Sequence, residues 1–301
     1  MKFLIVGASG FIGSYTLHYI RSLGYEVIGT KTNSKQSNLV SFDLFSDRIQ
    51  DCIDPTFFQT DRPIFGIIFS AFSRIDQCFL EQDKSSKINV KNTCRLLDDF
   101  KHLGIKPIFL SSDHVYNGTL GYYSEADTPN PINEYGRQKL AVENYIQKIF
   151  TDNFLVFRLS KIFGDNPKEA HPFSDWYQKI RNKQPIVCIQ GQIFSPTFVE
   201  DVAKGIVLSC QRNLSGIYHL ANPQFFPREE LARQFARSLG QEVEVVSKAQ
   251  EEFGFADKRP EKTYLDSTQF IRETGMSFTS MREVFETFVQ NLETDCSETI
   301  R

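Results

Sequence analysis

Short apolar runs alternate with stretches of helical periodicity through the first half of the chain. The runs predict buried parallel strands, because strands covered on both faces are apolar throughout. The predicted strands are Lys2–Val6, Tyr25–Gly29, a short third strand before Asp43, Ile64–Phe69, Ile108–Leu110 and Phe154–Leu159. The helices predicted between them include Ile12–Leu23, Lys87–Leu103 and Tyr135–Phe150. Such alternation of strands and helices predicts an α/β fold with a doubly wound parallel sheet.

The regular alternation ends near Gly164, where prolines begin to punctuate the chain. Later helices are predicted over 173–182, up to Gln211, over 227–239 and over 279–292, with strands at 216–220 and 243–246. Residues 295–301 read as a polar, frayed tail. We therefore expect one lobe over residues 1–163, with return segments near 192–222. A smaller, mostly C-terminal lobe is expected over residues 164–301.

A glycine triplet joins the first predicted strand to the first helix. Gly7, Gly10 and Gly13 have the spacing GxxGxxG, in the order strand, triplet, helix. Such glycines allow a tight turn, close approach of backbone to a pyrophosphate and close helix packing. Free N–H groups at the helix N-terminus then attract the phosphates. The sequence thus predicts a Rossmann dinucleotide site, whose loop also contains Ser9, Phe11 and Ile12.

The end of the second strand bears on which dinucleotide is bound. NAD-selective sites usually place an acidic residue there for the ribose 2′-hydroxyl, but no acid occurs before Asp43. Lys31 and Lys35 could neutralise a 2′-phosphate, which favours NADP and keeps NAD as the alternative. Asp43, followed by Leu44, could meet the adenine edge or cap the next helix. Small residues after the fourth run, Ser70 and Ala71, would suit close passage of the cofactor.

Candidate catalytic residues follow the strand at Ile108–Leu110. Polar side chains start there with Ser111 and Ser112, at the end of a strand where open α/β sheets bind ligands. Tyr135 and Lys139 are four residues apart and share a helix face. The ammonium group should lower the pKa of the Tyr135 phenol from about 10 toward neutrality. With Ser112 polarising a carbonyl, this set predicts redox chemistry on an alcohol or ketone, whereas the bare YxxxK pair by itself would favour a solvated helix face.

Composition narrows the classes of partner and location. The 301 residues are 41% apolar and 24% charged, with a net charge of −3, so no basic excess exists to bind nucleic acid. Six cysteines lack CxxC spacing, and we predict neither a metal site nor a disulfide framework. No apolar run reaches membrane-spanning length, so no membrane partner is expected. The first run is too short for a signal peptide, and the expected location is the cytoplasm.

In these motifs the chain resembles the extended short-chain dehydrogenase/reductases, and among them the dTDP-4-dehydrorhamnose reductase-like proteins. The glycine triplet and the Tyr135/Lys139 pair mark the superfamily. The more specific matches are Ser111–Gly118 to the pattern S-T-D-Y-V-F-x-G, Tyr123–Glu125 through Pro129–Pro131, Ser195–Thr197 with Val199–Asp201, and Gly216–Leu220.

The resemblance implies NADPH-dependent reduction of the 4-keto group of a nucleotide-linked 4-keto-6-deoxy sugar, as in dTDP-rhamnose biosynthesis. It implies that Tyr135 donates a proton to the C4 oxygen, that Ser112 binds the same oxygen, and that Lys139 lowers the pKa of Tyr135 and holds the nicotinamide ribose. Asp113, His114 and Lys161 would face the substrate. His114 stands in place of a tyrosine and Lys161 in place of a tryptophan, so the sugar itself stays open. The resemblance also allows a homodimer.

Two other functions stay open at this point. Nucleotide-sugar dehydratases and epimerases use the same scaffold with a recycled cofactor; the dehydratases carry Thr-Asp-Glu, whereas here Asp113 is followed by His114, whose imidazole could act as a base. The regulatory beta subunit of methionine adenosyltransferase resembles the same family, binds NADP and serves as a partner protein. Retained Tyr135 and Lys139 do not exclude such a non-catalytic role.

Overall fold

A seven-stranded parallel sheet forms the centre of the molecule. The computed structural model describes the backbone of residues 1–298 and the side chains of residues 1–294. The strand order is β11-β6-β5-β4-β1-β2-β3, and every neighbouring pair is parallel. The strands are β1 (Lys2–Val6), β2 (Glu26–Lys31), β3 (Val40–Ser41), β4 (Ile64–Ile68), β5 (Lys106–Ser112), β6 (Leu155–Leu159) and β11 (Gly216–His219). The predicted doubly wound sheet is confirmed.

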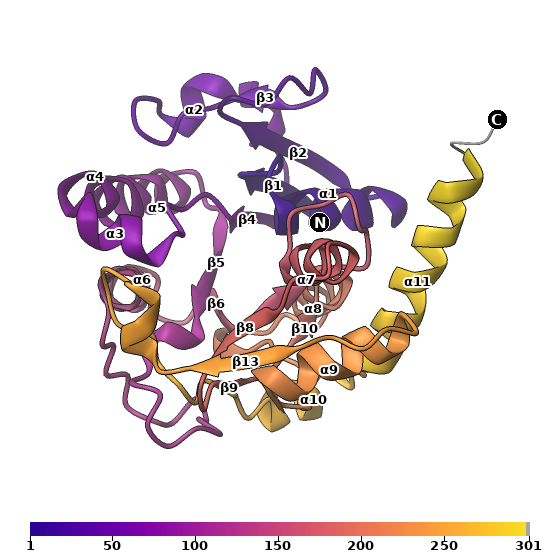
Figure 1. Cartoon of the computed structure of the whole chain (residues 1–301). Helices are drawn as coiled ribbons and strands as arrows, with labels where there is room; N and C mark the ends of the chain where they lie inside the picture. Colours follow the sequence, from indigo (N-terminus) through magenta and orange to yellow (C-terminus); the bar gives the residue numbers. More distant parts are fainter. Residues whose placement is uncertain (299–301) are drawn as a thin grey trace.

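Helices cover both faces of this sheet (Figure 1). Helices α1 (Phe11–Ser22) and α8 (Val199–Gln211) lie on one face, and α5 (Thr93–His102) and α6 (Glu134–Phe150) lie on the other. Alternate residues of β1 enter the two separate cores, with Phe3 and Ile5 on the α1 side and Leu4 and Val6 on the α6 side. Because both faces are covered, the strand is apolar throughout, which explains the pattern read from the sequence.

The helix predicted over Lys87–Leu103 is interrupted in the structure. The chain forms α3 (Ile75–Leu80) and α4 (Gln82–Ser86), then a π-helical turn η2 (Lys87–Asn92), and only then α5. The π turn brings Asn89 to a buried position, where its Nδ2 donates to Gln138 Oε1 of α6 at 2.7 Å. Asn89 also bonds to the amide and the carbonyl of Phe72. Apolar periodicity did not reveal this turn, because the partners of its polar residue lie far away in sequence.

The second lobe has an aromatic core under small sheets. Strand β8 (Ile186–Ile189) pairs in parallel with β13 (Val245–Lys248), and β9 (Ile193–Phe194) pairs antiparallel with β12 (Phe226–Pro227). Phe173, Trp176 and Phe235 are fully buried among the helices α7 (Pro172–Arg181), α9 (Arg228–Ser238) and α11 (Met281–Glu298). The remaining elements are α2 (Ile49–Cys52), β7 (Ile162–Phe163), β10 (Thr197–Phe198), α10 (Thr268–Thr274), and the 3₁₀ turns η1 (Pro55–Phe57), η3 (Asp113–Val115) and η4 (Gln250–Phe253).

The last helix is longer than the sequence pattern indicated. α11 extends away from the body of the molecule and continues to Glu298, past the predicted end at Leu292, so part of the expected frayed tail is helical (Figure 1). The rest of that tail, residues 299–301, lies outside the described residues. Over residues 1–298, no helix is both long and apolar enough to span a membrane.

Candidate functional site

The glycine loop after β1 is shaped for close approach of a ligand. Gly7 has φ +91°, and a Cβ on Gly13 would lie 2.3 Å from the Gly7 carbonyl oxygen, so packing within the loop requires both glycines. A Cβ on Gly10 would meet nothing nearer than 3.4 Å. Gly10 is therefore free of protein crowding at the N-terminus of α1, whose first turn has no acidic residue. This open cradle fits a dinucleotide pyrophosphate.

A cavity of about 380 Å³ extends from this loop over the carboxyl ends of the strands. The cavity is lined by Gly7, Gly10, Phe11, Ile12, Gly13 and Ala71. It is also lined by Ser112, Tyr135 and Lys139. The tertiary structure thus brings most of the predicted cofactor-binding residues to one cavity together with the predicted catalytic residues.

The other predicted cofactor residues do not line this cavity. Ser9 is exposed in the loop and Ser70 packs beside Gly7. Lys31 ends β2 and donates to the Gln36 carbonyl. Asp43 accepts a hydrogen bond from the Phe45 amide within its own turn, and Leu44 is buried in the core. The structure therefore shows a local turn role for Asp43.

Strand β5 and helix α6 position the candidate catalytic side chains. Ser112 is the last residue of β5, and Tyr135 and Lys139 lie in the first turns of α6. The Lys139 ammonium is buried, donates to the Leu110 carbonyl at 2.7 Å, and lies 5.7 Å from the centre of the Tyr135 ring. The three side chains therefore converge at the end of β5, as the sequence predicted.

The prediction that the pKa of Tyr135 falls toward neutrality is wrong for this structure. Burial raises the pKa of Tyr135 well above its usual range, and the Asp113 carboxylate and Cys78 raise it further, while the nearby Ser112 hydroxyl opposes them. Burial also lowers the pKa of Lys139 to about 8. The ammonium group points at a backbone carbonyl rather than at the phenol oxygen, so the four-residue spacing did not produce the expected charge pairing.

Asp113 holds two serines at the ends of neighbouring strands. The Ser112 hydroxyl donates to Asp113 Oδ1 at 2.9 Å, and the Ser160 hydroxyl, just beyond β6, donates to Oδ2 at 3.1 Å. Asp113 is only 5% exposed. The carboxylate therefore acts as a fixed anchor under the site.

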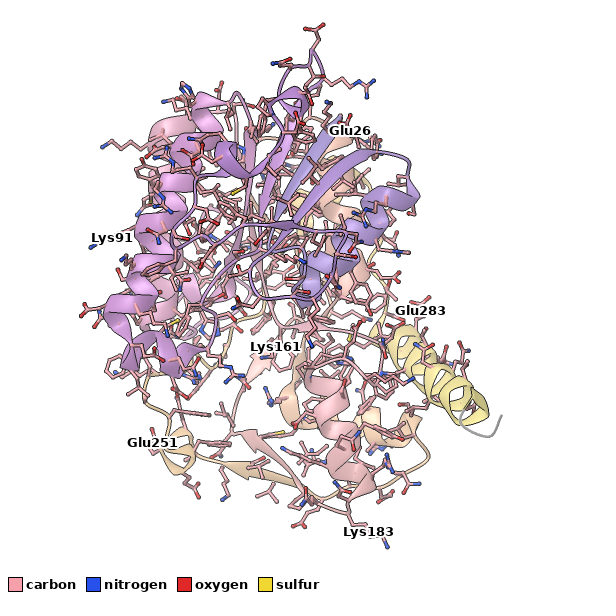
Figure 2. The ribbon with its side chains drawn as sticks, turned by 90° about the horizontal axis from the view of Figure 1, so that it is seen from above. Glu26, Lys91, Lys161, Lys183, Glu251 and Glu283 are labelled. Carbon is pink, nitrogen blue, oxygen red and sulfur yellow. The ribbon has the colours of Figure 1, made fainter. Side chains whose placement is uncertain are left out.

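A second, larger cavity of about 580 Å³ opens between the lobes. It shares Phe11, Ile12, Ser73, Ser112, Tyr135, Ser160 and Ile162 with the dinucleotide cavity. Asp113, His114 and Lys161, the predicted substrate residues, border it, and Lys161 lies between the lobes in Figure 2. The two cavities thus meet at Ser112 and Tyr135, where a bound cofactor and a bound substrate would come together.

Cations dominate the charge of the larger cavity. Lys161, Arg228 and Arg259 border it, and burial together with repulsion from the two arginines lowers the pKa of Lys161. Arg259 pairs with Asp76 at 2.9 Å. Among the side chains of residues 1–294, Lys161 and Arg228 have no carboxylate within ion-pair distance. These two charges make the cavity suited to an anionic ligand.

Sequence reasoning missed Arg228, Arg259 and the aromatic residues Phe253 and Phe255 that border this cavity. Arg228 begins α9, Phe253 ends the 3₁₀ turn η4, and Phe255 and Arg259 follow that turn, all far from the catalytic motifs in sequence. In the sequence, the feature that could have drawn attention to this segment is the Arg259-Pro260 pair close to the two phenylalanines. This pair shows no periodicity and matches no motif by itself.

Tyr15 of α1 lies near several carboxylates. The Tyr15 hydroxyl donates to Glu169 at 2.9 Å. Asp201 accepts from the Thr279 amide and hydroxyl near the start of α11, and Glu200 pairs with Lys204. Within the described part of the chain, no group of three or more His, Cys, Asp or Glu side chains is placed to hold a metal ion.

Comparison with known proteins identifies relatives over the whole chain. Residues 1–294 match the family described as RmlD substrate binding domain. The chain is 27% identical to the spore coat polysaccharide biosynthesis protein SpsK of Bacillus subtilis, over 98% of this chain and 99% of SpsK. It is also 26% identical to the methionine adenosyltransferase 2 subunit beta of Rattus norvegicus, over 77% of this chain and 70% of that protein.

Solved structures agree with this assignment. A hypothetical dTDP-4-dehydrorhamnose reductase from Sulfolobus tokodaii superposes with a TM-score of 0.81 at 26% identity, over 94% of this chain and 99% of the other. The dTDP-4-dehydrorhamnose reductase of Bacillus anthracis in complex with NADP gives 0.81 at 25% identity, over 96% and 99%. With the family match spanning nearly every residue and the predicted resemblance confirmed, the chain belongs to the RmlD substrate binding domain family, whose structural neighbours are nucleotide-sugar reductases of the extended short-chain dehydrogenase/reductase type.

Proposed function

We propose that this protein uses NADPH to reduce the 4-keto group of a nucleotide-linked 4-keto-6-deoxy sugar in the cytoplasm, as in dTDP-rhamnose biosynthesis. The observation that carries the proposal is the meeting of two cavities at Ser112 and Tyr135. One cavity begins at the glycine loop, and the other is bordered by Lys161 and Arg228, which have no carboxylate partner among the described side chains. A hydride donor in the first and a sugar in the second would meet beside an alcohol and a phenol.

In this proposal the reduced nicotinamide supplies the hydride, and the chain supplies orientation and a proton. Tyr135 is the proton donor to the C4 oxygen, and its raised pKa keeps the phenol protonated at neutral pH until the developing alkoxide takes the proton. Ser112 turns its hydroxyl from Asp113 to the same oxygen. Lys139, fixed by the Leu110 carbonyl, holds the nicotinamide ribose and carries positive charge beside the reacting oxygen.

Charge supports a nucleotide sugar as the substrate. Lys161 and Arg228 border the larger cavity without carboxylate partners, and a nucleoside diphosphate brings two or more negative charges to it. Guanidinium groups bind phosphates in a fork geometry, which suits Arg228 in particular. The 580 Å³ volume lies within the range of small-molecule sites.

The choice of NADPH over NADH rests on Lys31, at the end of β2, and Lys35, which follows it. Replacing Lys31 and Lys35 with alanine should weaken NADPH binding and spare NADH binding, because only NADPH carries the 2′-phosphate. Titration of each dinucleotide against wild-type and double-variant protein measures this. Equal losses for both dinucleotides would show that the lysines do not read the 2′-phosphate. The NADP bound in the similar Bacillus anthracis structure supports the proposal.

A panel experiment tests the whole proposal. Purified protein is mixed with NADPH and a set of 4-keto nucleotide sugars, including dTDP-4-keto-6-deoxyglucose, while the absorbance of NADPH is followed. We expect absorbance loss with at least one sugar and a 4-hydroxy sugar as product. Copurifying, slowly exchanging NAD with no net oxidation would instead favour an epimerase or dehydratase.

The non-catalytic alternative is favoured by one observation, the 26% identity to the methionine adenosyltransferase 2 subunit beta over 77% of this chain. Tight NADPH binding without turnover of any sugar would favour that role. Binding of a methionine adenosyltransferase catalytic subunit, measured by analytical ultracentrifugation, would then test it directly.

A further inference from the structure

His114 lies directly beside the proposed proton donor. It belongs to the 3₁₀ turn η3, which follows β5, and its ring meets the Tyr135 ring edge-to-face at 5.9 Å between centroids. His114 borders the larger cavity, and its backbone amide donates to Ser112 Oγ at 3.2 Å. The imidazole is thus held next to the reacting groups, where its protonation pattern decides what it can bind.

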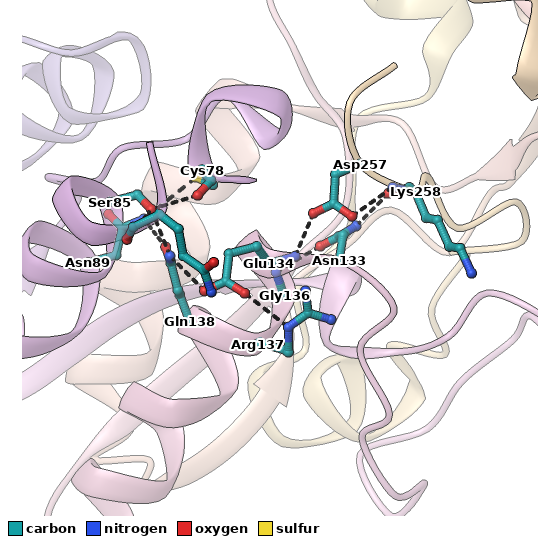
Figure 3. A network of polar contacts seen from close by, with 11 residues as sticks. Cys78, Ser85, Asn89, Asn133, Glu134, Gly136, Arg137, Gln138, Asp257 and Lys258 are labelled. Carbon is teal, nitrogen blue, oxygen red and sulfur yellow. Dashed lines mark hydrogen bonds and ion pairs between the residues drawn. The ribbon is translucent and has the colours of Figure 1, made fainter. Parts of the chain in front are cut away.

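Asn133 presents its amide to this imidazole in one orientation only. As the N-cap of α6, Asn133 accepts a hydrogen bond from the Gly136 amide through Oδ1 at 2.8 Å. Its Nδ2 donates to the Lys258 carbonyl oxygen at 3.0 Å (Figure 3). A backbone N–H can only donate and a carbonyl can only accept, so both partners independently fix which side of the Asn133 amide is NH₂. Asn133 is fully buried.

The same NH₂ group fixes the tautomer of His114. Asn133 Nδ2 lies 2.9 Å from His114 Nδ1. Since Nδ2 has only hydrogens to offer, Nδ1 must be the unprotonated acceptor, and the ring hydrogen of the neutral imidazole must be on Nε2. Burial lowers the pKa of His114 and so favours the neutral ring.

His114 Nε2–H is left facing open space. No side chain or backbone group of the described residues hydrogen-bonds to it, and it is not among the buried polar atoms that lack a partner. His114 borders the larger cavity. Because its Nε2–H is neither hydrogen-bonded within the described residues nor buried, this donor is available to a ligand in the cavity.

We propose that His114 is a neutral hydrogen-bond donor, through Nε2–H, to an oxygen of the sugar next to the reacting carbon, and that Asn133 is the positioning residue that holds it. This proposal rests on the proposed function and sharpens it. With its hydrogen on Nε2 and its lone pair on Nδ1 occupied by Asn133, His114 cannot accept a proton from the substrate. The sugar therefore presents an acceptor oxygen, such as that of a hydroxyl, at this position, and elimination with His114 as the base is disfavoured.

The first experiment determines the tautomer of His114 in the absence of any sugar. Protein labelled with ¹⁵N-histidine is examined by long-range ¹H–¹⁵N correlation at neutral pH, and the His114 signals are those missing in His114→Gln. We expect Nε2 to carry the hydrogen and Nδ1 to show the shift of an unprotonated, hydrogen-bonded nitrogen. Protonation at Nδ1 in the wild-type protein would overturn the proposal.

A second experiment uses a matched pair of variants. Gln and Glu at position 114 have the same shape, but only Gln offers a donor near the Nε2 position. With the sugar that the panel identifies, H114Q should keep kcat/KM within about fivefold of wild type, and H114E should lose at least about tenfold more. A base role predicts the reverse order. His102→Gln, on the exposed side of α5, serves as the control and should change nothing.

Asn133 is tested with a substitution that keeps the helix cap. Serine is as good an N-cap as asparagine but has no amide to hold the imidazole. N133S should lower kcat/KM by about tenfold in the wild-type chain and have no further effect in the H114E chain, because the two residues act together. Equal losses in both chains would overturn the positioning role. A wild-type protein that reduces none of the sugars would overturn the proposed function and the donor role together, whatever the NMR experiment shows about the tautomer.

Discussion

Lys139 has an ammonium group that is buried away from solvent. The residue is 6% exposed, and among the described residues its ammonium group donates to the Leu110 carbonyl alone, at 2.7 Å. Burial lowers its pKa from 10.5 to about 8, so the folded state holds the ammonium group less favourably than the unfolded chain does. The residue is therefore kept at a cost in stability, which is typical of groups placed for function.

Lys139→Met should accordingly stabilise the protein at pH 7, by about 1–3 kcal/mol, while abolishing turnover. Below pH 8 both states of the wild-type chain are protonated and the folded state bears the whole cost. As the pH rises from about 8 toward 10.5, the folded state loses its proton first, and the difference between variant and wild type should shrink. Urea unfolding of both chains at pH 7 and pH 10 measures this. A constant difference across that range would contradict it.

Tyr135→Phe should reduce kcat by about 10²- to 10⁴-fold and leave NADPH affinity nearly unchanged, because it removes only the hydroxyl that protonates the product oxygen. Steady-state kinetics and dinucleotide titration give the two quantities. Tyr145→Phe is the control on the same helix, where the hydroxyl binds Asp98 at 2.6 Å away from both cavities. Activity that survives the first change would remove Tyr135 from the mechanism.

Helix α6 links the site to the sheet through a buried ion pair. Arg158 of β6 and Glu143 of α6 are 3% and 0% exposed, with their closest atoms, Nη2 and Oε2, 2.7 Å apart. Ser111 of β5 also donates to Glu143, and Arg158 Nη1 donates to the Tyr116 hydroxyl at 2.6 Å. The polar network fixes α6, and with it Tyr135 and Lys139, against β5 and β6.

Arg158→Leu should destabilise the protein by about 3–5 kcal/mol, because it leaves the Glu143 carboxylate buried without its cation. The double variant Arg158→Leu with Glu143→Leu should recover much of that loss. Denaturant unfolding of the two single variants and the double variant gives the coupling. Arg282→Ala, which breaks the exposed pair with Glu286 on α11, is the control and should have no measurable effect. Additive losses from the two single changes would contradict the argument.

On the scale of the whole molecule, residues 250–259 close the larger cavity from the second lobe. This segment returns to α3 of the first lobe, where Asp76 Oδ1 accepts from the Ala256 and Asp257 amides and Oδ2 pairs with Arg259. The Glu134 amide of α6 also donates to Asp257, as Figure 3 shows. These contacts connect the segment to the first lobe, and Arg259, Phe253 and Phe255 of the segment border the cavity.

Asp76→Ala should therefore loosen this segment without unfolding the sheet. We expect the amides of Ala256 and Asp257 to exchange hydrogen about tenfold faster or more, while amides of β1 and β5 keep their rates. Native-state hydrogen exchange followed by NMR measures both sets. The same substitution at Asp98, on α5, is the control. Unchanged exchange at residues 256 and 257 would show that Asp76 does not hold the segment.

Local signals in the sequence were enough for the central sheet and part of the site. Apolar runs marked β1, β4, β5 and β6, because these strands are covered on both faces, and the glycine triplet marked the loop at Gly7–Gly13. Strands β8 and β9 have only four and two residues and carry no readable period. The π turn at Lys87–Asn92 looked like plain helix, since the Gln138 partner of Asn89 is 49 residues away.

The sequence by itself determined the doubly wound sheet and the family and predicted the set Ser112, Tyr135 and Lys139, because each is marked by short local motifs or apolar runs. Only the tertiary structure decided the electrostatics. Burial raises the pKa of Tyr135 and lowers that of Lys139, and the Asn133 amide places the hydrogen of His114 on Nε2. The tertiary structure also brings Arg228 and Arg259 together at the larger cavity. The physical reason is that pKa values depend on burial and on the charges nearby in space. The spacing of residues along the chain does not reveal which groups become spatial neighbours.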